Sequence, residues 1–164
     1  MARISEKTAG GRNVLAFLDM LAFSEGTATS RYTRDEGYDV IVGGIDSPNV
    51  FTGYGDHPGV LVTVNSKGLK STAAGRYQLL QRWWMPYRKS LALKDFSPVS
   101  QDMVAIQQIR ERGALPDIMV GHIATAIDKV SNIWASLPGA GYGQREHKLE
   151  DLLARYYAAG GILA

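Results

Sequence analysis

The chain contains no cysteine in its 164 residues, which excludes disulfide bonds and thiolate metal sites. No apolar stretch reaches the roughly 18 residues that a membrane-spanning helix needs, and residues 1–7 lack the apolar core of a secretory signal. The net charge is only +2, whereas nucleic-acid-binding proteins usually cluster basic residues on one face. We therefore expect a fold that depends on packing alone, with no membrane insertion and no nucleic-acid partner.

The remaining composition is that of an ordinary globular protein. Hydrophobic residues make up 45% and charged residues 21% of the chain, which argues against disorder. The length suits one domain with a real core, and no repeat, low-complexity block or linker interrupts it. We expect one monomeric domain over residues 1–164, with residues 1–11 forming a loose N-terminal arm.

An apolar stripe at helical spacing follows that arm. Its members lie at positions i, i+4, i+7 and i+11 of one helix face, and Gly26 comes next at a position suited to end the helix. The last member of the stripe is a carboxylic acid rather than a hydrophobic residue. The stripe consists of Val14, Leu18, Leu21 and Glu25.

The character of the sequence changes between about residues 32 and 68. Glycine, proline and aspartate separate short β-rich runs at 38–42, 50–52 and 60–64, which predicts an antiparallel sheet of two or three strands. Helical patterns return afterwards, and helices around a small sheet make an α+β domain. A lysozyme-like fold, mainly helical with a small antiparallel sheet flanking an active-site cleft, is one such arrangement. The further helices are predicted to begin near Tyr77, to run from Pro98 to about Gly113, to carry Ile123, Ile127, Val130 and Trp134 on one face, and to pack through Leu149, Leu152, Leu153 and Tyr156.

Glu25 is the strongest candidate for chemistry. Because it continues an apolar stripe, its carboxyl group should be partly desolvated, and both burial and the negative end of the helix dipole raise a carboxyl pKa. A glutamic acid that stays protonated near neutral pH can donate a proton to the leaving oxygen of a glycosidic bond. Periodicity alone does not decide the matter, because a surface glutamate at a helix end is the commoner case.

Three nearby acids offer a second carboxylate. A glycoside hydrolase needs two carboxyl groups across the scissile bond, and Asp35 could sit opposite Glu25 at the start of the predicted sheet. A solvated turn is the commoner role for such a segment, since aspartate and glycine favour turns. The acids are Asp35, Glu36 and Asp39.

Two further segments combine groups that suit a sugar. Gly75 allows close backbone approach to a ligand, and the residues after it supply an aromatic face and hydrogen-bonding groups. The second segment surrounds the glycine-rich loop at 138–143, where aromatic and polar groups alternate. A loop-to-helix junction and an ordinary core position are the plainer interpretations of these two segments. The candidate residues are Arg76, Tyr77, Gln78, Trp134, Ser136, Leu137, Pro138 and Tyr142.

Over residues 14–161 the chain resembles the lambda-type phage endolysins. The resemblance rests on several stretches that occur in the same order along nearly the whole chain, and their order and coverage make chance agreement implausible. The stretches are residues 16–22, 24–27, 37–44, 71–80, 93–98, 107–116 and 131–144.

This resemblance implies a lysozyme-like fold and a lytic transglycosylase with one essential glutamate, which matches Glu25. In such an enzyme the glutamic acid protonates the glycosidic oxygen between N-acetylmuramic acid and N-acetylglucosamine. It then deprotonates the C6 hydroxyl of muramic acid, and a 1,6-anhydro sugar results. The wider transglycosylase pattern suggests that residues 76–78 line one side of the cleft, and that the 137–138 loop and Tyr142 line the other. No cofactor is implied, and the three histidines lack metal-ligand spacing, so no metal is expected.

The resemblance also implies partners and a location. The substrate would be the glycan strands of peptidoglycan, and the protein would remain in the host cytoplasm until a holin pore releases it to the cell wall in the periplasm.

Two other hypotheses about the function stay open. One is a hydrolytic muramidase that uses Glu25 with Asp35, and the other is a non-catalytic domain that binds cell wall or nucleic acid. The basic residues are spread out rather than clustered, which gives the second alternative little support.

Overall fold

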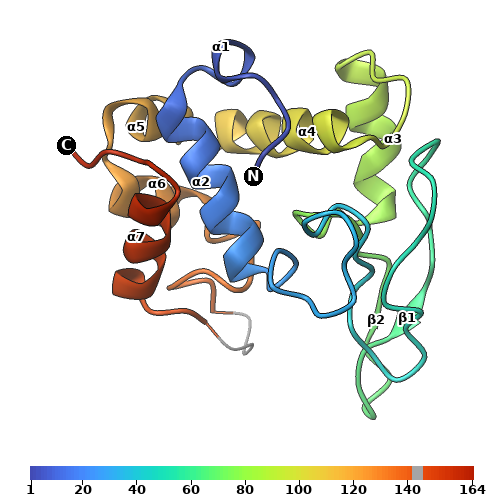
Figure 1. The fold of residues 1–164 in the computed structure, drawn as a ribbon. Coiled ribbons are helices and arrows are strands. Elements are labelled where there is room, and N and C mark those ends of the chain that lie inside the picture. Colours follow the sequence, from blue (N-terminus) through green and yellow to red (C-terminus); the bar gives the residue numbers. More distant parts are fainter. Residues whose placement is uncertain (142–145) are drawn as a thin grey trace. The chain divides into compact units, whose positions relative to one another are not determined.

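The computed structural model describes residues 1–141 and 146–164, which form seven helices and one two-stranded sheet (Figure 1). These residues form two compact units, residues 1–25 with 102–164 and residues 26–101. Helices dominate the first unit, whereas the second combines long loops with the small sheet. Within the described ranges, no helix combines the length and apolar character needed to cross a bilayer.

In the first unit, α2 (Arg12–Ser24) packs against several other helices. It contacts both α5 (Leu115–Val120) and α7 (Leu149–Ala158), and α6 (Ile123–Val130) contacts the same two helices. The first and last predicted helices of this unit are confirmed as α2 and α7. The predicted helix of Ile123 to Trp134 is shorter, because α6 ends at Val130, and the short α5 was not predicted. A six-residue helix contains too few turns to show a hydrophobic period.

The apolar stripe predicted for the first helix is confirmed. Its three hydrophobic members are fully buried. Burying one such side chain stabilises a fold by about 1.5–3 kcal/mol, so the packed stripe fixes α2 firmly in place. These members are Val14, Leu18 and Leu21.

The N-terminal arm differs from the loose segment expected over residues 1–11. It contains a short helix, α1 (Glu6–Ala9), and its start is held by a buried acid. The carboxylate of Asp102 accepts hydrogen bonds from the backbone N–H groups of Arg3 at 2.7 Å and Ile4 at 2.8 Å. Composition could not indicate this anchor, because the partner lies 98 residues further along the chain.

The sheet of the second unit is smaller than predicted. It consists of β1 (Val62–Thr63) paired antiparallel with β2 (Lys70–Ser71). The predicted run at 60–64 supplies β1, while the runs at 38–42 and 50–52 form isolated backbone bridges, one of which joins them. The helix-rich α+β class is confirmed, although most of the expected strand residues lie in loops.

The helix expected near Tyr77 begins later, at the first residue of α3 (Gln81–Ser90). A tight turn precedes it, because Gly75 has φ 79° and Gln78 has φ 51°, both in the left-handed region. By contrast, α4 (Pro98–Glu111) begins at the predicted proline and ends just before Gly113.

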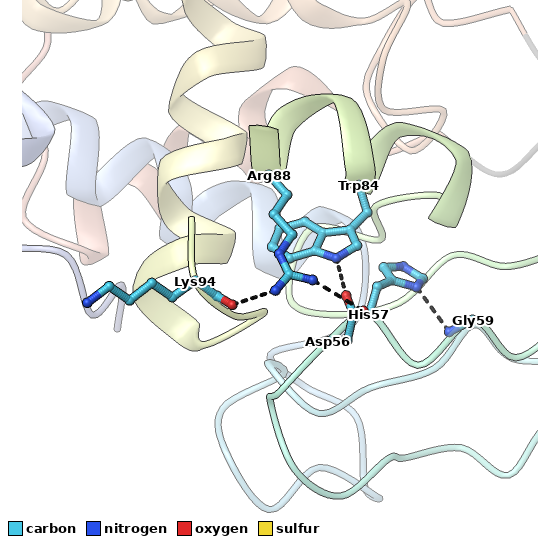
Figure 2. A network of polar contacts seen from close by, with 6 residues as sticks. All are labelled: Asp56, His57, Gly59, Trp84, Arg88 and Lys94. Carbon is cyan, nitrogen blue, oxygen red and sulfur yellow. Dashed lines mark hydrogen bonds and ion pairs between the residues drawn. The ribbon is translucent and has the colours of Figure 1, made fainter. Parts of the chain in front are cut away.

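A polar network ties α3 to the loop at Asp56 within the second unit (Figure 2). The Asp56 carboxylate accepts a hydrogen bond from the indole Nε1 of Trp84 and pairs with the Arg88 guanidinium at 3.3 Å. Arg88 also donates to the backbone oxygen of Lys94 at 2.8 Å. The hydrogen bond from Trp84 is the largest cause that lowers the pKa of Asp56, so this carboxyl is a structural anion.

His57 lies beside this network with both ring nitrogens engaged. Its Nδ1 accepts the backbone N–H of Gly59 at 3.1 Å (Figure 2). Its Nε2 lies 2.9 Å from the carbonyl oxygen of Leu79. Because a carbonyl only accepts, the hydrogen must sit on Nε2, which defines a neutral imidazole. Burial, the largest cause, lowers the pKa of His57 and favours the same neutral form.

Candidate active site

Glu25 follows the last residue of α2 and acts as its C-cap. Its backbone is still helical, with φ −74° and ψ −5°, and its N–H donates to the carbonyl oxygen of Leu21 at 2.9 Å. The carboxylate therefore stands at the end of a helix whose buried face cannot shift without opening the core of the first unit. Rigid support of this kind is what a group engaged in proton transfer needs.

The carboxyl group of Glu25 is desolvated although the residue stays half-buried. Burial raises the pKa of Glu25 from its ordinary 4.5, and the hydrogen bond from Ser136 opposes that rise. Ser136 Oγ lies 2.5 Å from Glu25 Oε1, a short distance of the kind found between a hydroxyl and a carboxylate. The direction of the shift agrees with the expectation drawn from the apolar stripe, and the chemical role of Glu25 stays a prediction.

The segment after α6 supplies the hydroxyl that meets Glu25. Trp134 is 3% exposed and Leu137 is fully buried, so both side chains belong to the core of the first unit. Ser136 and Pro138 are half-buried. The structure thus brings one of the predicted sugar-contact residues, Ser136, directly onto the predicted catalytic acid. Tyr142, predicted to line the cleft, lies outside the described residues.

His147, which sequence reasoning missed, binds the backbone of Ser136 and of Ser24, the residue before Glu25. The backbone N–H of His147 donates to the carbonyl oxygen of Ser136 at 2.9 Å, and its Nε2 lies 3.2 Å from the carbonyl oxygen of Ser24. Its ring lies 5.2 Å from the ring of Phe23, over which the Arg155 guanidinium sits at 4.2 Å. His147 and Ser24 are 123 residues apart, so no local pattern could have revealed the pairing.

In the second unit, the predicted site residues Arg76 and Tyr77 are buried at 2% and 4% exposure. The Arg76 guanidinium donates to the backbone oxygen of Glu36, and its backbone N–H donates to Gln101 Oε1 at 2.9 Å. Its carbonyl oxygen accepts the hydroxyl of Thr27 at 2.6 Å. These contacts make Arg76 a structural centre of the second unit.

Gln78 is the more accessible member of this group. It is half-buried, and its side-chain amide donates to the carbonyl oxygen of Gly75 at 3.0 Å. Its positive φ of 51° is uncommon for a residue with a side chain, and such strain often occurs at ligand-binding positions. Of the predicted trio, Gln78 has the geometry best suited to touch a ligand.

The three acids weighed as a second carboxylate differ in their surroundings. Asp39 is buried and accepts the hydroxyl of Thr33 at 2.5 Å, so it serves to close its own turn. Glu36 is exposed. Asp35 is half-buried and accepts the hydroxyl of Tyr54 at 2.7 Å. Among the described residues, no group of three or more His, Asp or Glu side chains is placed to hold a metal ion.

Comparison with known proteins agrees with the fold and covers nearly the whole chain. The family model described as Endolysin matches residues 15–163. The endolysin of Escherichia phage lambda is 67% identical over 149 residues, which cover 90% of this chain and 91% of that protein. The endolysin of Escherichia phage P2 is 59% identical over 158 residues, which cover 93% of this chain and 96% of that protein.

Two solved structures extend the agreement to three dimensions. Bacteriophage lambda lysozyme in complex with a chitohexasaccharide matches with a TM-score of 0.87 and 61% identity, covering 100% of both chains. A second structure, lysozyme from bacteriophage lambda, matches with a TM-score of 0.83 and 59% identity over 100% of both chains. The lysozyme-like fold expected from the sequence is confirmed. By its sequence and by its fold, this chain belongs to the endolysin family.

Proposed function

We propose that this endolysin lyses a phage host by cutting the glycan strands of cell-wall peptidoglycan, with Glu25 as the acid and then the base. The observation that carries the proposal is the desolvated carboxyl group of Glu25 at the end of the buried face of α2. The match to a lambda lysozyme that was solved with a chitohexasaccharide supports a sugar polymer as the substrate class.

The proposed reaction is lytic transglycosylation. Cleavage needs a proton for the leaving oxygen between N-acetylmuramic acid and N-acetylglucosamine, and burial, which raises the pKa of Glu25, favours the protonated acid that can donate it. The resulting Glu25 carboxylate then removes the proton of the muramic C6 hydroxyl, whose oxygen bonds to the anomeric carbon of the same sugar. The product is a 1,6-anhydro end, and because no water is consumed one carboxyl group suffices.

Exposure divides the proposed substrate-binding residues into two kinds. Residues with accessible side-chain surface can meet the sugar directly, whereas fully packed ones hold the backbone around them. Tyr142 remains a candidate without structural description. The accessible residues are Gln78, Ser136 and Pro138, and the packed ones are Arg76, Tyr77, Trp134 and Leu137.

The substitution Glu25→Gln tests the proposal. Glutamine keeps the size of the side chain but cannot transfer a proton, so the rate of peptidoglycan clearing should fall on the order of 10²-fold or more. The control is Glu150→Gln, which neutralises an exposed acid of α7 and should clear peptidoglycan at the unchanged rate. A Glu25→Gln protein with the wild-type rate would exclude Glu25 as the acid.

The alternative is a hydrolytic muramidase, favoured by the partly buried position of Asp35 against Tyr54. It requires Asp35 as a second carboxylate, so Asp35→Asn should abolish activity, whereas the transglycosylase should retain most of it. Mass spectrometry of the digest separates the two reactions directly. Anhydro ends support the transglycosylase, and reducing muramic ends, each one water heavier, support the muramidase.

We further propose that the enzyme works as a monomer and reaches the wall only after a holin opens the inner membrane. Family membership supports this order of events. Cells that express the chain alone should stay intact and should lyse when the inner membrane is permeabilised chemically. Lysis by the chain alone would argue against the need for a separate pore, and light scattering would report the oligomeric state.

A further inference from the structure

A chain of four oxygen atoms runs from the carboxyl group of Glu25 into the end of α2. Ser136 Oγ lies 2.5 Å from Glu25 Oε1 and 3.1 Å from Ser24 Oγ. Ser24 Oγ in turn lies 2.9 Å from the carbonyl oxygen of Leu21. All four groups lie in the first unit, and Ser24 is only 5% exposed.

Counting hydrogens fixes the direction of part of this chain. A carbonyl oxygen can only accept, so the single hydroxyl hydrogen of Ser24 points to Leu21. Ser24 can then only accept from Ser136. Ser136 has one hydrogen and two acceptors within reach, Glu25 Oε1 and Ser24 Oγ, and it can satisfy one of them fully at a time.

The protonation state of Glu25 decides between these acceptors. A carboxylate is the stronger acceptor, so the Ser136 hydrogen points to Glu25 when Glu25 is ionised. A protonated carboxyl carries its own hydrogen, which Ser136 Oγ can accept while its own hydrogen turns to Ser24. Each form of Glu25 therefore has a matching orientation of the Ser136 hydroxyl group.

We propose that Ser136 and Ser24 form a switching pair of positioning residues, in which the Ser136 hydrogen turns between Glu25 and Ser24 as Glu25 gives up and regains its proton. This inference rests on the proposed function of Glu25 as an acid and then a base. The transferred proton moves only between Glu25 and the substrate, and each serine keeps its own hydrogen throughout. The pair supports both halves of the cycle without a change in backbone position.

His147 holds the two serines at the spacing that the switch requires. Its backbone N–H donates to the carbonyl oxygen of Ser136 at 2.9 Å, and its ring Nε2 donates to the carbonyl oxygen of Ser24 at 3.2 Å. One residue thus binds the backbone of both partners. The Ser136 hydroxyl group can turn while the Cα positions of both serines are fixed.

The switch predicts opposite effects for two alanine variants. Ser136→Ala removes a hydrogen bond that is stronger to the Glu25 carboxylate than to the neutral acid. Glu25 in this variant should therefore hold its proton roughly tenfold more tightly. Ser24→Ala removes the acceptor that Ser136 uses only when Glu25 is protonated. The protonated form then loses support, and proton affinity should fall by roughly threefold to fivefold.

Two further variants serve as controls. Ser131→Ala removes a hydroxyl that donates to a carbonyl three residues back at 2.9 Å, as Ser24 does, but Ser131 caps α6 away from this chain of oxygens. It should leave the titration of Glu25 unchanged. Ser136→Thr keeps the hydroxyl group and should restore the wild-type titration. If Ser24→Ala unfolds, Ser24→Cys, whose sulfur is a weak acceptor, takes its place.

The decisive measurement is an NMR titration of the glutamate side-chain carboxyl carbons in the full-length chain, with the Glu25 signal assigned by its loss in Glu25→Gln. Midpoints that move upward in Ser136→Ala and downward in Ser24→Ala support the switch, and the alkaline limb of the activity profile should move in the same directions. Shifts in the same direction, or none, would overturn it. Should Glu25→Gln retain activity, the proposed function fails, yet the titration still tests the serine pair.

Discussion

Replacing Gln101 with leucine should destabilise the protein strongly although the two side chains have similar volumes. The Gln101 amide is 4% exposed and all its hydrogen bonds go to backbone groups. Its Oε1 accepts the N–H of Arg76 at 2.9 Å, and its Nε2 donates to the carbonyl oxygens of Tyr38 at 3.1 Å and Phe96 at 3.0 Å. Leucine removes all of these bonds and restores none.

The expected loss follows from the groups that Gln101→Leu leaves behind. A buried donor or acceptor deprived of its partner costs about 1–3 kcal/mol, and a carbonyl lies at the lower end because it has a second lone pair. One N–H and two carbonyls together give about 3–5 kcal/mol in the free energy of unfolding. For a chain of this length, that corresponds to a fall in Tm of roughly 6–20 °C.

Urea unfolding followed by circular dichroism measures the change. Gln107→Leu is the matched control, because this glutamine lies on the same helix but bonds to the side chains of Glu111 and Arg110 near the surface. It should change the free energy of unfolding by less than about 0.5 kcal/mol. A Gln101→Leu protein within about 1 kcal/mol of that control would refute the hydrogen-bond accounting. Gln101→Glu adds a second test. A carboxylate that faces two carbonyl oxygens should destabilise the folded protein at neutral pH, and a protonated carboxyl group should do so less in acid.

Two more predictions concern stability. Burial lowers the pKa of His57 below its ordinary 6.5 in the folded chain. As the pH falls, His57 therefore takes up a proton more readily in the unfolded chain than in the folded chain. The free energy of unfolding should then fall as the pH drops below about 6.5. Urea midpoints measured from pH 7.5 to 5 would show this, and His57→Asn should flatten the slope while the exposed His122→Asn should not. Asp102→Ala removes the acceptor of two N-terminal N–H groups and should lower the free energy of unfolding by about 2–4 kcal/mol. Hydrogen exchange at Arg3 and Ile4 should then speed up markedly, and unchanged exchange at both would argue against the anchor.

The parts of the fold that could be predicted from the sequence are those with a local signal. The stripe of α2 repeats a hydrophobic residue every third or fourth position, so its buried face and the acid at its end can both be predicted from the sequence. The start of α4 is marked by Pro98, whose fixed backbone angle suits the first helical position. In both cases the residues that determine the structure lie within a few positions of one another.

The features that could not be predicted lack such a local signal. The contact between the Ser136 hydroxyl and Glu25 spans 111 residues of sequence, so no local pattern predicts it, and the sugar contact of Ser136 stays a prediction. Residues 38–42 have the composition of a strand, yet their backbone groups pair with scattered loops, so only bridges result. The expected helix at Tyr77 is delayed because Gly75 and Gln78 adopt positive φ, and for Gln78 no sequence rule predicts that conformation.

The surroundings of Glu25 explain why this one acid suits both halves of the proposed reaction. Burial alone would hold the proton so firmly that the carboxyl would be a poor donor and its carboxylate would not persist as a base. Several strong donors around it would have the opposite effect and leave it ionised before the substrate arrives. Burial raises its pKa and the single hydroxyl of Ser136 lowers it, so the two causes oppose each other. A two-step reaction requires such opposition, because the same group must first release a proton and then take one back. A variant that strengthens either cause alone should therefore slow the cycle even where it leaves the fold intact.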